Sequence, residues 1–287
     1  MRLLVTGAAG MLGQDVVAAA TRAGHDVVAL ARRDLDITDA DAVRRVVLDA
    51  SPAAVINCAA WTDVDGAEAA EAEADAVNGL GAGHLAGAAA NAGALAVHVS
   101  TDYVFAGNRP SPRSEREAYV ESDEVDPRTA YGRTKLHGEA AVREASPRHA
   151  IARAAWVFGP GGGNFVDTMR RLAGECEEVI VVDDQVGCPT YTGHLATALL
   201  EIAERGLTGT LHVAGGGRCS WYDLAEATFA ATGAGVRLRR GSSTDLERPA
   251  PRPAFSVLAT ERDDAPRLPD WRAGLAAHLE ASTIGTA

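Results

Sequence analysis

Three glycines near the start of the chain, Gly7, Gly10 and Gly13, recur at every third position and constrain the fold more than any other feature. They lie between an apolar, strand-like run at residues 2–5 and an alanine-rich segment at residues 16–23 that is typical of a helix. In such a strand–turn–helix unit, the first glycine permits the tight turn, the second lets the backbone approach a pyrophosphate, and the third lets the helix pack closely on the sheet. The phosphates then lie at the helix N-terminus. This region therefore predicts a dinucleotide-binding unit.

Strands and helices are predicted to alternate along the first half of the chain. Apolar runs typical of buried parallel strands occur at residues 2–5, 26–31, 53–56, 94–99 and 151–157. This alternation predicts an α/β fold, a Rossmann-type doubly wound parallel sheet, over residues 1–158. The pattern changes at the glycine-rich turn 159–163, so residues 159–287 are expected to form mainly a smaller C-terminal substrate lobe. Residues from about 194 to 214 are expected to rejoin the main sheet.

The composition excludes several classes of function. With a formal net charge of −12 the chain offers no positive stripe for a phosphate backbone, so no nucleic-acid partner is expected. No run of about 18 apolar residues occurs and no charged-then-apolar leader precedes the first strand, so we expect a cytoplasmic protein without a membrane partner. The four cysteines are scattered without a Cys-x-x-Cys pair, which favours neither a disulfide framework nor a zinc ribbon.

The residues after the second predicted strand indicate which dinucleotide binds. An NAD-preferring site places an acidic residue there, against the ribose hydroxyls. This chain has Arg32 and Arg33 instead, and two guanidinium groups favour a 2′-phosphate. We therefore expect NADPH, with NADH as the alternative. Asp36 and Ile37 are expected to flank the adenine, and the small Ala59 after the third strand lets a cofactor lie against the backbone.

A tyrosine and a lysine four residues apart indicate acid–base chemistry. Tyr131 and Lys135 lie at the start of a predicted helix, where residues four apart share a face. A neighbouring ammonium is expected to lower the pKa of the phenol and make it a usable proton donor near neutrality. Thr101 follows the fourth strand about 30 residues earlier, and its hydroxyl would hold a carbonyl oxygen for protonation.

An ordered series of short blocks covers nearly the whole chain. It resembles the series found in the dTDP-4-dehydrorhamnose reductase family, within the extended short-chain dehydrogenase/reductase superfamily. The narrowest signatures are Asp-Gln-x-Gly-x-Pro-Thr, from residue 184, and Arg-Pro-x-x-Ser, from residue 252. The blocks occupy residues 7–13, 35–39, 57–60, 100–105, 131–136, 153–158, 164–169, 184–190, 220–223 and 252–256.

The resemblance implies a role for each matching residue. Thr101 would orient the 4-keto oxygen, Tyr131 would donate the proton, and Lys135 would bind the nicotinamide ribose. The substrate-binding residues would be Asp102, Tyr103, Trp156, Asn164, Gln185 and Arg252, with Trp156 against the sugar and the last three at the diphosphate. The cofactor-binding residues would be Gly7, Gly10, Met11, Leu12, Gly13, Arg32, Arg33, Asp36, Ile37, Ala59, Ala60, Tyr131 and Lys135.

The implied reaction is NADPH-dependent reduction of the C4 keto group of dTDP-4-dehydro-L-rhamnose to dTDP-L-rhamnose, with a dTDP-sugar as substrate. Some members of the family form dimers that bind Mg²⁺ through acidic residues. This chain reads Tyr191-Thr192-Gly193-His194 where one of those carboxylates would lie. We therefore expect no required metal, and a monomer or homodimer.

Three other functions are found on folds of this kind. A sugar-nucleotide 4,6-dehydratase needs Asp followed by Glu after the threonine, whereas Asp102 is followed by Tyr103. A reductase or epimerase of a related nucleotide-linked 4-keto-6-deoxyhexose stays open. So does a non-catalytic NADP-binding subunit like the regulatory subunit of methionine adenosyltransferase, although the intact Thr101, Tyr131 and Lys135 argue against it.

Overall fold

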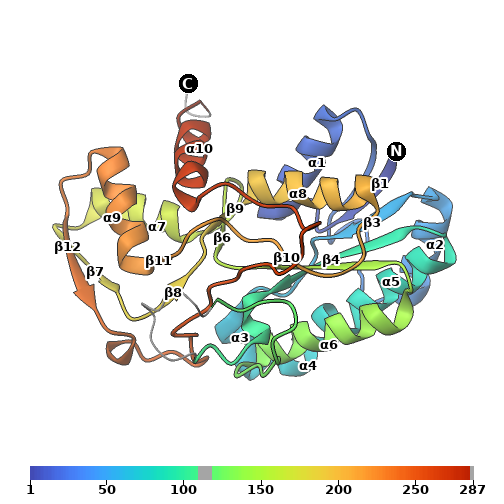
Figure 1. Cartoon of the computed structure of the whole chain (residues 1–287), viewed down its shortest axis with the longest axis horizontal. Helices are drawn as coiled ribbons and strands as arrows, with labels where there is room; N and C mark the ends of the chain where they lie inside the picture. The colour runs from blue at the N-terminus through green and yellow to red at the C-terminus, as the bar shows by residue number, and fades with distance from the viewer. Residues whose placement is uncertain (109–117, 285–287) are drawn as a thin grey trace.

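A six-stranded parallel sheet forms the centre of the molecule, in a computed structural model that describes residues 1–108 and 118–284 (Figure 1). Its strand order is β10-β5-β4-β3-β1-β2. Nearly every residue of β1, β3, β4 and β5 is buried, as expected for parallel strands covered on both faces. The strands are β1 (Arg2–Thr6), β2 (Asp26–Leu30), β3 (Ala54–Asn57), β4 (Leu95–Thr101), β5 (His149–Ala154) and β10 (Gly209–His212).

Helices pack on both faces of this sheet. On one face α1 (Met11–Arg22) packs against α8 (Thr192–Arg205). The other face is covered by α2 (Ala40–Ala50), α5 (Ala82–Asn91) and α6 (Ala130–Ala145), of which α5 and α6 lie below the sheet in Figure 1. Short elements complete this part of the chain: α3 (Val64–Ala69), α4 (Glu71–Asp75), the π-helix η1 (Ala76–Gly81) and the 3₁₀ turn η2 (Asp102–Val104). The predicted Rossmann-type doubly wound sheet is therefore confirmed.

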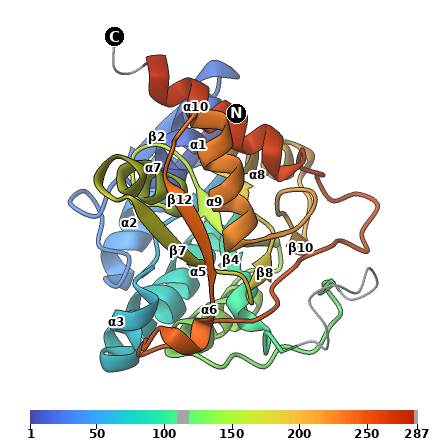
Figure 2. The ribbon, with the colours of Figure 1, turned by 90° about the vertical axis from the view of Figure 1, so that its left-hand side faces the viewer.

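The second half of the chain builds a smaller group of elements beside the sheet. Two parallel strands, β7 (Glu178–Val182) and β12 (Arg237–Gly241), pack against α7 (Phe165–Glu175) and α9 (Trp221–Thr232). Figure 2 shows these strands and α9 in front of the main sheet. The remaining elements are β6 (Val157–Phe158), β8 (Val186–Gly187), β9 (Thr190–Tyr191), β11 (Cys219–Ser220), η3 (Ser243–Asp245) and α10 (Trp271–Ile284).

The strand predicted at residues 151–157 is wrong in its C-terminal part. The main-sheet strand β5 ends at Ala154, and β6 pairs instead with β9 in a separate two-stranded sheet. Between them Trp156 adopts a left-handed φ of 47°, which turns the chain out of the main sheet. Downstream, β10 pairs with β5 at the edge of the main sheet. The division into residues 1–158 with 194–214, and the rest as a substrate lobe, stays a prediction.

Candidate active site

A cavity of about 1430 Å³ opens at the carboxyl ends of the central strands and is closed on its far side by the smaller lobe. Its walls come from the glycine turn after β1, the segment after β3, the end of β4, the first turn of α6, and residues of α7, β7 and α9. In an open α/β sheet, this edge is where ligands bind. Most of the residues predicted from the sequence lie here, although they come from segments far apart in the chain.

The glycine turn brings backbone close to backbone at one end of the cavity. Gly7 has a φ of +66°, and a Cβ on it would lie 2.6 Å from the backbone of Cys58 and Ala59. A Cβ on Gly13 would lie 2.1 Å from the carbonyl oxygen of Gly7. Neither position tolerates a side chain, and the result is a turn of exposed backbone leading into α1. Gly10, Met11, Leu12, Ala59 and Ala60 also line the cavity.

The two arginines after β2 differ in their surroundings. Arg32 lines the cavity together with Asp36 and Ile37, and none of the described carboxylates lies within ion-pair distance of its guanidinium. The Arg33 side chain is 88% exposed, lies 3.7 Å from Asp34 and is outside the cavity wall. Only one of the two predicted cations therefore faces this space.

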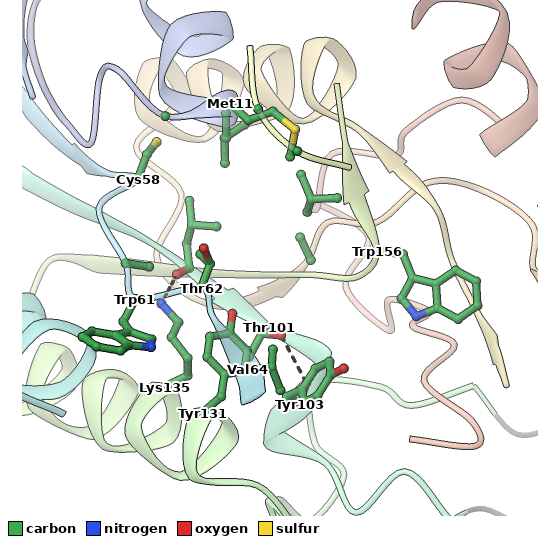
Figure 3. Close-up of a pocket in the computed structure, with 18 of the residues that line it drawn as sticks. Met11, Cys58, Trp61, Thr62, Val64, Thr101, Tyr103, Tyr131, Lys135 and Trp156 are labelled. Atoms are coloured by element: carbon green, nitrogen blue, oxygen red, sulfur yellow. Dashed lines mark hydrogen bonds between the residues drawn. The ribbon is translucent and has the colours of Figure 1, made fainter. Parts of the chain in front are cut away.

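Thr101, Tyr131 and Lys135, called the triad below, lie close together in the cavity (Figure 3). The Thr129 side chain accepts a hydrogen bond from the backbone N–H of Gly132 and so begins α6, which places Tyr131 and Lys135 one turn apart on the same face. Thr101 is the last residue of β4. Its hydroxyl donates to Asp102 at 3.0 Å and accepts from the Tyr103 backbone N–H at 3.2 Å.

The expectation that Lys135 lowers the pKa of Tyr131 is wrong for this structure. Burial raises the pKa of Tyr131 to about 12, and its hydrogen bond with Thr101 only partly offsets this. Lys135 does not act on the phenol because its ammonium is directed elsewhere, donating to the carbonyl oxygen of Val99 at 2.7 Å. Burial lowers the pKa of Lys135 itself to about 8.

Asp102 is a buried carboxyl group in direct contact with the triad. Burial raises its pKa to about 6, and the hydroxyl groups of Ser256 and Thr101 oppose that rise only in part. The neighbouring Tyr103 ring stands edge-on to Tyr131, with ring centroids 5.4 Å apart. Both residues line the cavity, as their place after the threonine predicts.

Aromatic rings form the wall farther from the triad. Trp156 stacks on Trp221 with ring centroids 3.6 Å apart and an interplanar angle of 2°. A Cβ on Gly187 would lie 2.4 Å from the Trp156 indole, so this position has to be glycine. Gln185 accepts a hydrogen bond from the Trp221 indole N–H at 3.1 Å, which fixes both groups in the wall.

Two residues predicted at the diphosphate have other partners. Arg252 lines the cavity, but its guanidinium forms a bidentate ion pair with Asp65, at 2.9 and 2.8 Å. Asn164 lies outside the cavity wall, because its side chain caps the N-terminus of α7 and donates to the carbonyl oxygen of Gly159. Arg248 lines the cavity instead, exposed and with no described carboxylate at ion-pair distance.

Sequence reasoning missed several residues of the wall. Trp221 lies in a recognised block of the sequence, yet nothing in the pattern shows that it stacks on Trp156. Arg248 precedes the Arg-Pro-x-x-Ser signature by four residues and carries no periodic signal of its own. The cavity is also lined by Trp61, Thr62 and Val64, which follow β3. The sequence signal that could have identified them is an aromatic and a hydroxyl side chain within an otherwise alanine-rich segment.

No group of three or more His, Cys, Asp or Glu side chains arranged to hold a metal ion occurs within residues 1–108 and 118–284. At residues 191–194, where some family members have a metal-binding carboxylate, Tyr191 packs edge-on against His194.

Among the described helices, none combines the length and the apolar character needed to cross a membrane.

Comparisons with known proteins agree with this geometry. Residues 1–284 match the family described as RmlD substrate binding domain. The dTDP-4-dehydrorhamnose reductase of Mycobacterium tuberculosis (strain ATCC 25618 / H37Rv) is 46% identical over 99% of this chain and 94% of its own length.

Two solved structures are similar along nearly the whole chain. The dTDP-4-dehydrorhamnose reductase of Clostridium acetobutylicum is 38% identical with a TM-score of 0.94, covering 99% of this chain and 100% of its own. That of Bacillus anthracis, solved in complex with NADP, is 35% identical with a TM-score of 0.93, covering 98% of this chain and 99% of its own. The chain therefore belongs to the RmlD family, the family of the dTDP-4-dehydrorhamnose reductases.

Proposed function

We propose that this protein reduces the C4 keto group of dTDP-4-dehydro-L-rhamnose with NADPH and releases dTDP-L-rhamnose. The observation that carries the proposal is a single cavity in which Thr101, Tyr131 and Lys135 lie between a phosphate-accepting glycine turn and a wall of stacked indoles. The names of the relatives and the NADP bound in the Bacillus anthracis structure support it.

The residues at the β1 end of the cavity fit a dinucleotide. The exposed backbone around Gly7 and Gly13 and the N-terminus of α1 suit a pyrophosphate. Arg32 suits a 2′-phosphate, since a guanidinium without a carboxylate partner binds a phosphate by charge-assisted hydrogen bonds. When bound, the nicotinamide supplies the hydride that reduces the sugar carbon.

The triad residues perform the proton chemistry. Tyr131 donates its phenolic proton to the C4 oxygen, and its burial keeps that proton in place until a negative charge develops on the oxygen. Thr101 holds the same oxygen with its hydroxyl hydrogen once Asp102 is protonated and no longer accepts that hydrogen, and the Tyr103 backbone N–H fixes the position of the Thr101 oxygen. Lys135 supplies a positive charge and N–H donors from the next turn of α6.

The far wall orients the sugar nucleotide. The Trp156 ring presents a flat apolar face to the deoxyhexose, and its rotation is blocked by Trp221 on one side and Gly187 close behind it. Gln185 and Arg248 lie farther out, where an amide and an unpaired guanidinium suit the diphosphate.

The test is oxidation of NADPH, followed by absorbance, with enzymatically prepared dTDP-4-dehydro-L-rhamnose in the presence of a chelator. The expected result is turnover by the native protein and a loss of about 10²–10⁴-fold in kcat for Tyr131→Phe, which lacks the proton. Unchanged NADPH binding by that variant would show that only the chemical step is affected.

Two controls separate the alternatives. The dTDP-linked 4-keto-6-deoxy-D-glucose, which differs in ring stereochemistry, should turn over more slowly than the L-sugar; a faster reaction would assign a related reductase. NADPH binding without turnover of either sugar, even with Mg²⁺ restored, would support the non-catalytic subunit and contradict the proposal.

A further inference from the structure

A chain of buried polar side chains runs from the sheet interior to the catalytic lysine. Thr6, Asn57, His98 and Lys135 lie on β1, β3, β4 and α6, and none is more than 4% exposed. Thr6 Oγ1 donates to Asn57 Oδ1 at 2.8 Å, Asn57 Nδ2 lies 3.1 Å from His98 Nδ1, and His98 Nε2 lies 3.3 Å from Lys135 Nζ. None of the roles derived above uses His98.

The orientation of the Asn57 amide is fixed by a donor that cannot reverse. The backbone N–H of Ala59 lies 3.0 Å from Asn57 Oδ1, and a backbone N–H only donates. The atom it reaches is therefore the amide oxygen, and the Asn57 NH₂ group faces His98. Because that group only donates, His98 Nδ1 has to be an acceptor without a proton.

The hydrogen of the neutral His98 ring therefore lies on Nε2, the atom that faces Lys135. Burial, with the Lys135 charge adding to it, lowers the pKa of His98 well below its ordinary value, so the ring stays neutral. An N–H directed at an ammonium finds no lone pair, whereas the uncharged amine of a lysine offers one. The contact between His98 and Lys135 thus favours the amine.

We propose that His98 is a positioning residue, which Asn57 holds as the Nε2–H tautomer. In this form His98 favours the uncharged amine of Lys135 and thereby lowers the upper pH limit of the reaction. This inference rests on the proposed function only in its kinetic consequence. The tautomer itself is a property of the folded protein.

The other influences on Lys135 and His98 do not all act in the same direction as this contact. Burial is the main cause of the lowered pKa of Lys135, while Glu139 on the next turn of α6 and the Cys58 thiol after β3 act to raise it. The Val99 carbonyl oxygen accepts from Nζ in either form of the lysine. Arg143, farther along α6, lowers the pKa of His98 and so helps to keep the ring neutral.

The direct test is the nitrogen spectrum of ¹⁵N-histidine-labelled full-length protein between pH 5 and 9. The His98 signal is assigned as the one lost in His98→Gln. We expect an unprotonated Nδ1 and a protonated Nε2 across that range. A protonated Nδ1, or an imidazolium anywhere in that range, would overturn the proposal.

The kinetic test is the alkaline limb of the kcat/KM profile. In His98→Gln the amide oxygen is free to accept from the ammonium, so the limb should move up by about one pH unit, the shift expected for one exchanged hydrogen bond. Asn57→Asp should move it in the same direction, because a carboxylate accepts from Nδ1 and leaves the Nε2 lone pair facing Lys135. In that variant the nitrogen spectrum should also show the opposite tautomer.

The matched control is His149→Gln, at the start of β5, where the ring contacts only the Ser146 carbonyl among the described hydrogen bonds. It should leave the limb in place. An unmoved limb in His98→Gln would overturn the proposal. Should the native protein turn over no keto-sugar, the Lys135 titration followed by lysine NMR replaces the limb: a rise in His98→Gln supports the role of His98, and an unchanged value contradicts it.

Discussion

Thr101 donates its hydroxyl hydrogen to Asp102, so the protonation state of this carboxyl group determines whether the threonine hydroxyl can donate into the cavity. While Asp102 is ionised it accepts this hydrogen, and Thr101 then presents its lone pairs to the cavity. When Asp102 is protonated, the threonine hydrogen is free to point at the sugar oxygen. The raised pKa of Asp102, about 6, brings this exchange close to neutrality.

Asp102 should make the stability of the protein depend on pH. Its pKa is raised on folding, so its favourable contribution is present below pH 4 and is lost as the pH rises through about 6. The loss amounts to about 3 kcal/mol. In urea unfolding, Asp102→Asn should therefore gain about that much relative to the native protein between pH 4 and pH 7.5. A difference that stays constant with pH would contradict a buried carboxyl at this site.

Arg248 and Arg239 offer a comparison at the outer end of the cavity. Arg248→Gln should raise the KM for the sugar nucleotide about tenfold with little change in kcat, because a diphosphate contact is present in both ground and transition states. Arg239→Gln, on the outside of β12 and paired with Glu178, should change neither value. Steady-state kinetics would decide it, and equal effects of the two substitutions would remove Arg248 from the site.

The sequence could predict the positions of Thr101, Tyr131 and Lys135 in the fold, because the information needed is local. The four-residue spacing of Tyr131 and Lys135 needs only one helix, and Thr101 needs only the end of one strand. It could not predict that Arg252 is paired, because its partner Asp65 lies 187 residues away in the chain. The prediction that Lys135 lowers the pKa of Tyr131 was wrong for a related reason, because the burial of the phenol depends on the assembled fold.

At the scale of elements, a buried ion-pair cluster holds α6 against the sheet. Glu139 of α6 is fully buried and accepts from Arg153 of β5 at 2.8 and 2.7 Å and from the Ser100 hydroxyl at 2.7 Å. Burial by itself would raise the pKa of Glu139, but these donors outweigh it and the pKa is lowered. The cluster fixes the helix that carries Tyr131 and Lys135.

Breaking that cluster on one side should be costly. Arg153→Met leaves a buried carboxylate without its main partner, and the free energy of unfolding at pH 7 should fall by about 3–5 kcal/mol. Arg171→Met, which removes one side of an exposed ion pair with Glu175 on α7, should cost less than about 1 kcal/mol. Denaturant unfolding measures both, and equal losses would show that the cluster does not hold α6.

The break between β5 and β6 shows where pattern reasoning stops at this scale. Residues 151–157 are apolar enough to read as one strand, and no glycine or proline marks the interruption. The turn is made by Trp156 with a positive φ, which packing against Trp221 and Gly187 maintains. Such a conformation follows from tertiary contacts, which the local sequence does not record.

At the scale of the whole molecule, the alternating pattern was sufficient for the Rossmann-type sheet but not for the position of its last strand, β10, within that sheet. The strands β5, β4, β3, β1 and β2 lie side by side in that order, with β1 between β3 and β2, as expected for a doubly wound sheet. The strand β10 joins the same sheet only after the chain has passed through the smaller lobe. There β10 pairs with β5, and its Leu211 lies in the same buried cluster as Leu195 and Leu199 of α8.

Cofactor binding should stabilise the whole chain. Ligand that binds only the folded state at a concentration 100 times its Kd adds about 2.7 kcal/mol to the free energy of unfolding, visible as a higher Tm.

Arg32→Ala should weaken NADPH binding about 10–100-fold and leave NADH binding unchanged, since only NADPH carries the 2′-phosphate. Arg33→Ala, whose side chain is 88% exposed beside Asp34, should stay within about twofold of the native protein. If Arg33→Ala weakened NADPH binding more than Arg32→Ala does, the 2′-phosphate would lie outside the cavity.

We propose that NADPH bound in this cavity transfers hydride to C4 of a dTDP-linked keto-sugar, while Tyr131 supplies the proton. The most direct measurement uses NADPH deuterated at C4 of the nicotinamide, with each face labelled in a separate reaction and the sugar product read by NMR. We expect dTDP-L-rhamnose with deuterium at C4 of the sugar from one labelled face, and about 10²–10⁴-fold slower formation of product by Tyr131→Phe. A product without deuterium from either face, or undiminished product from Tyr131→Phe, would contradict it.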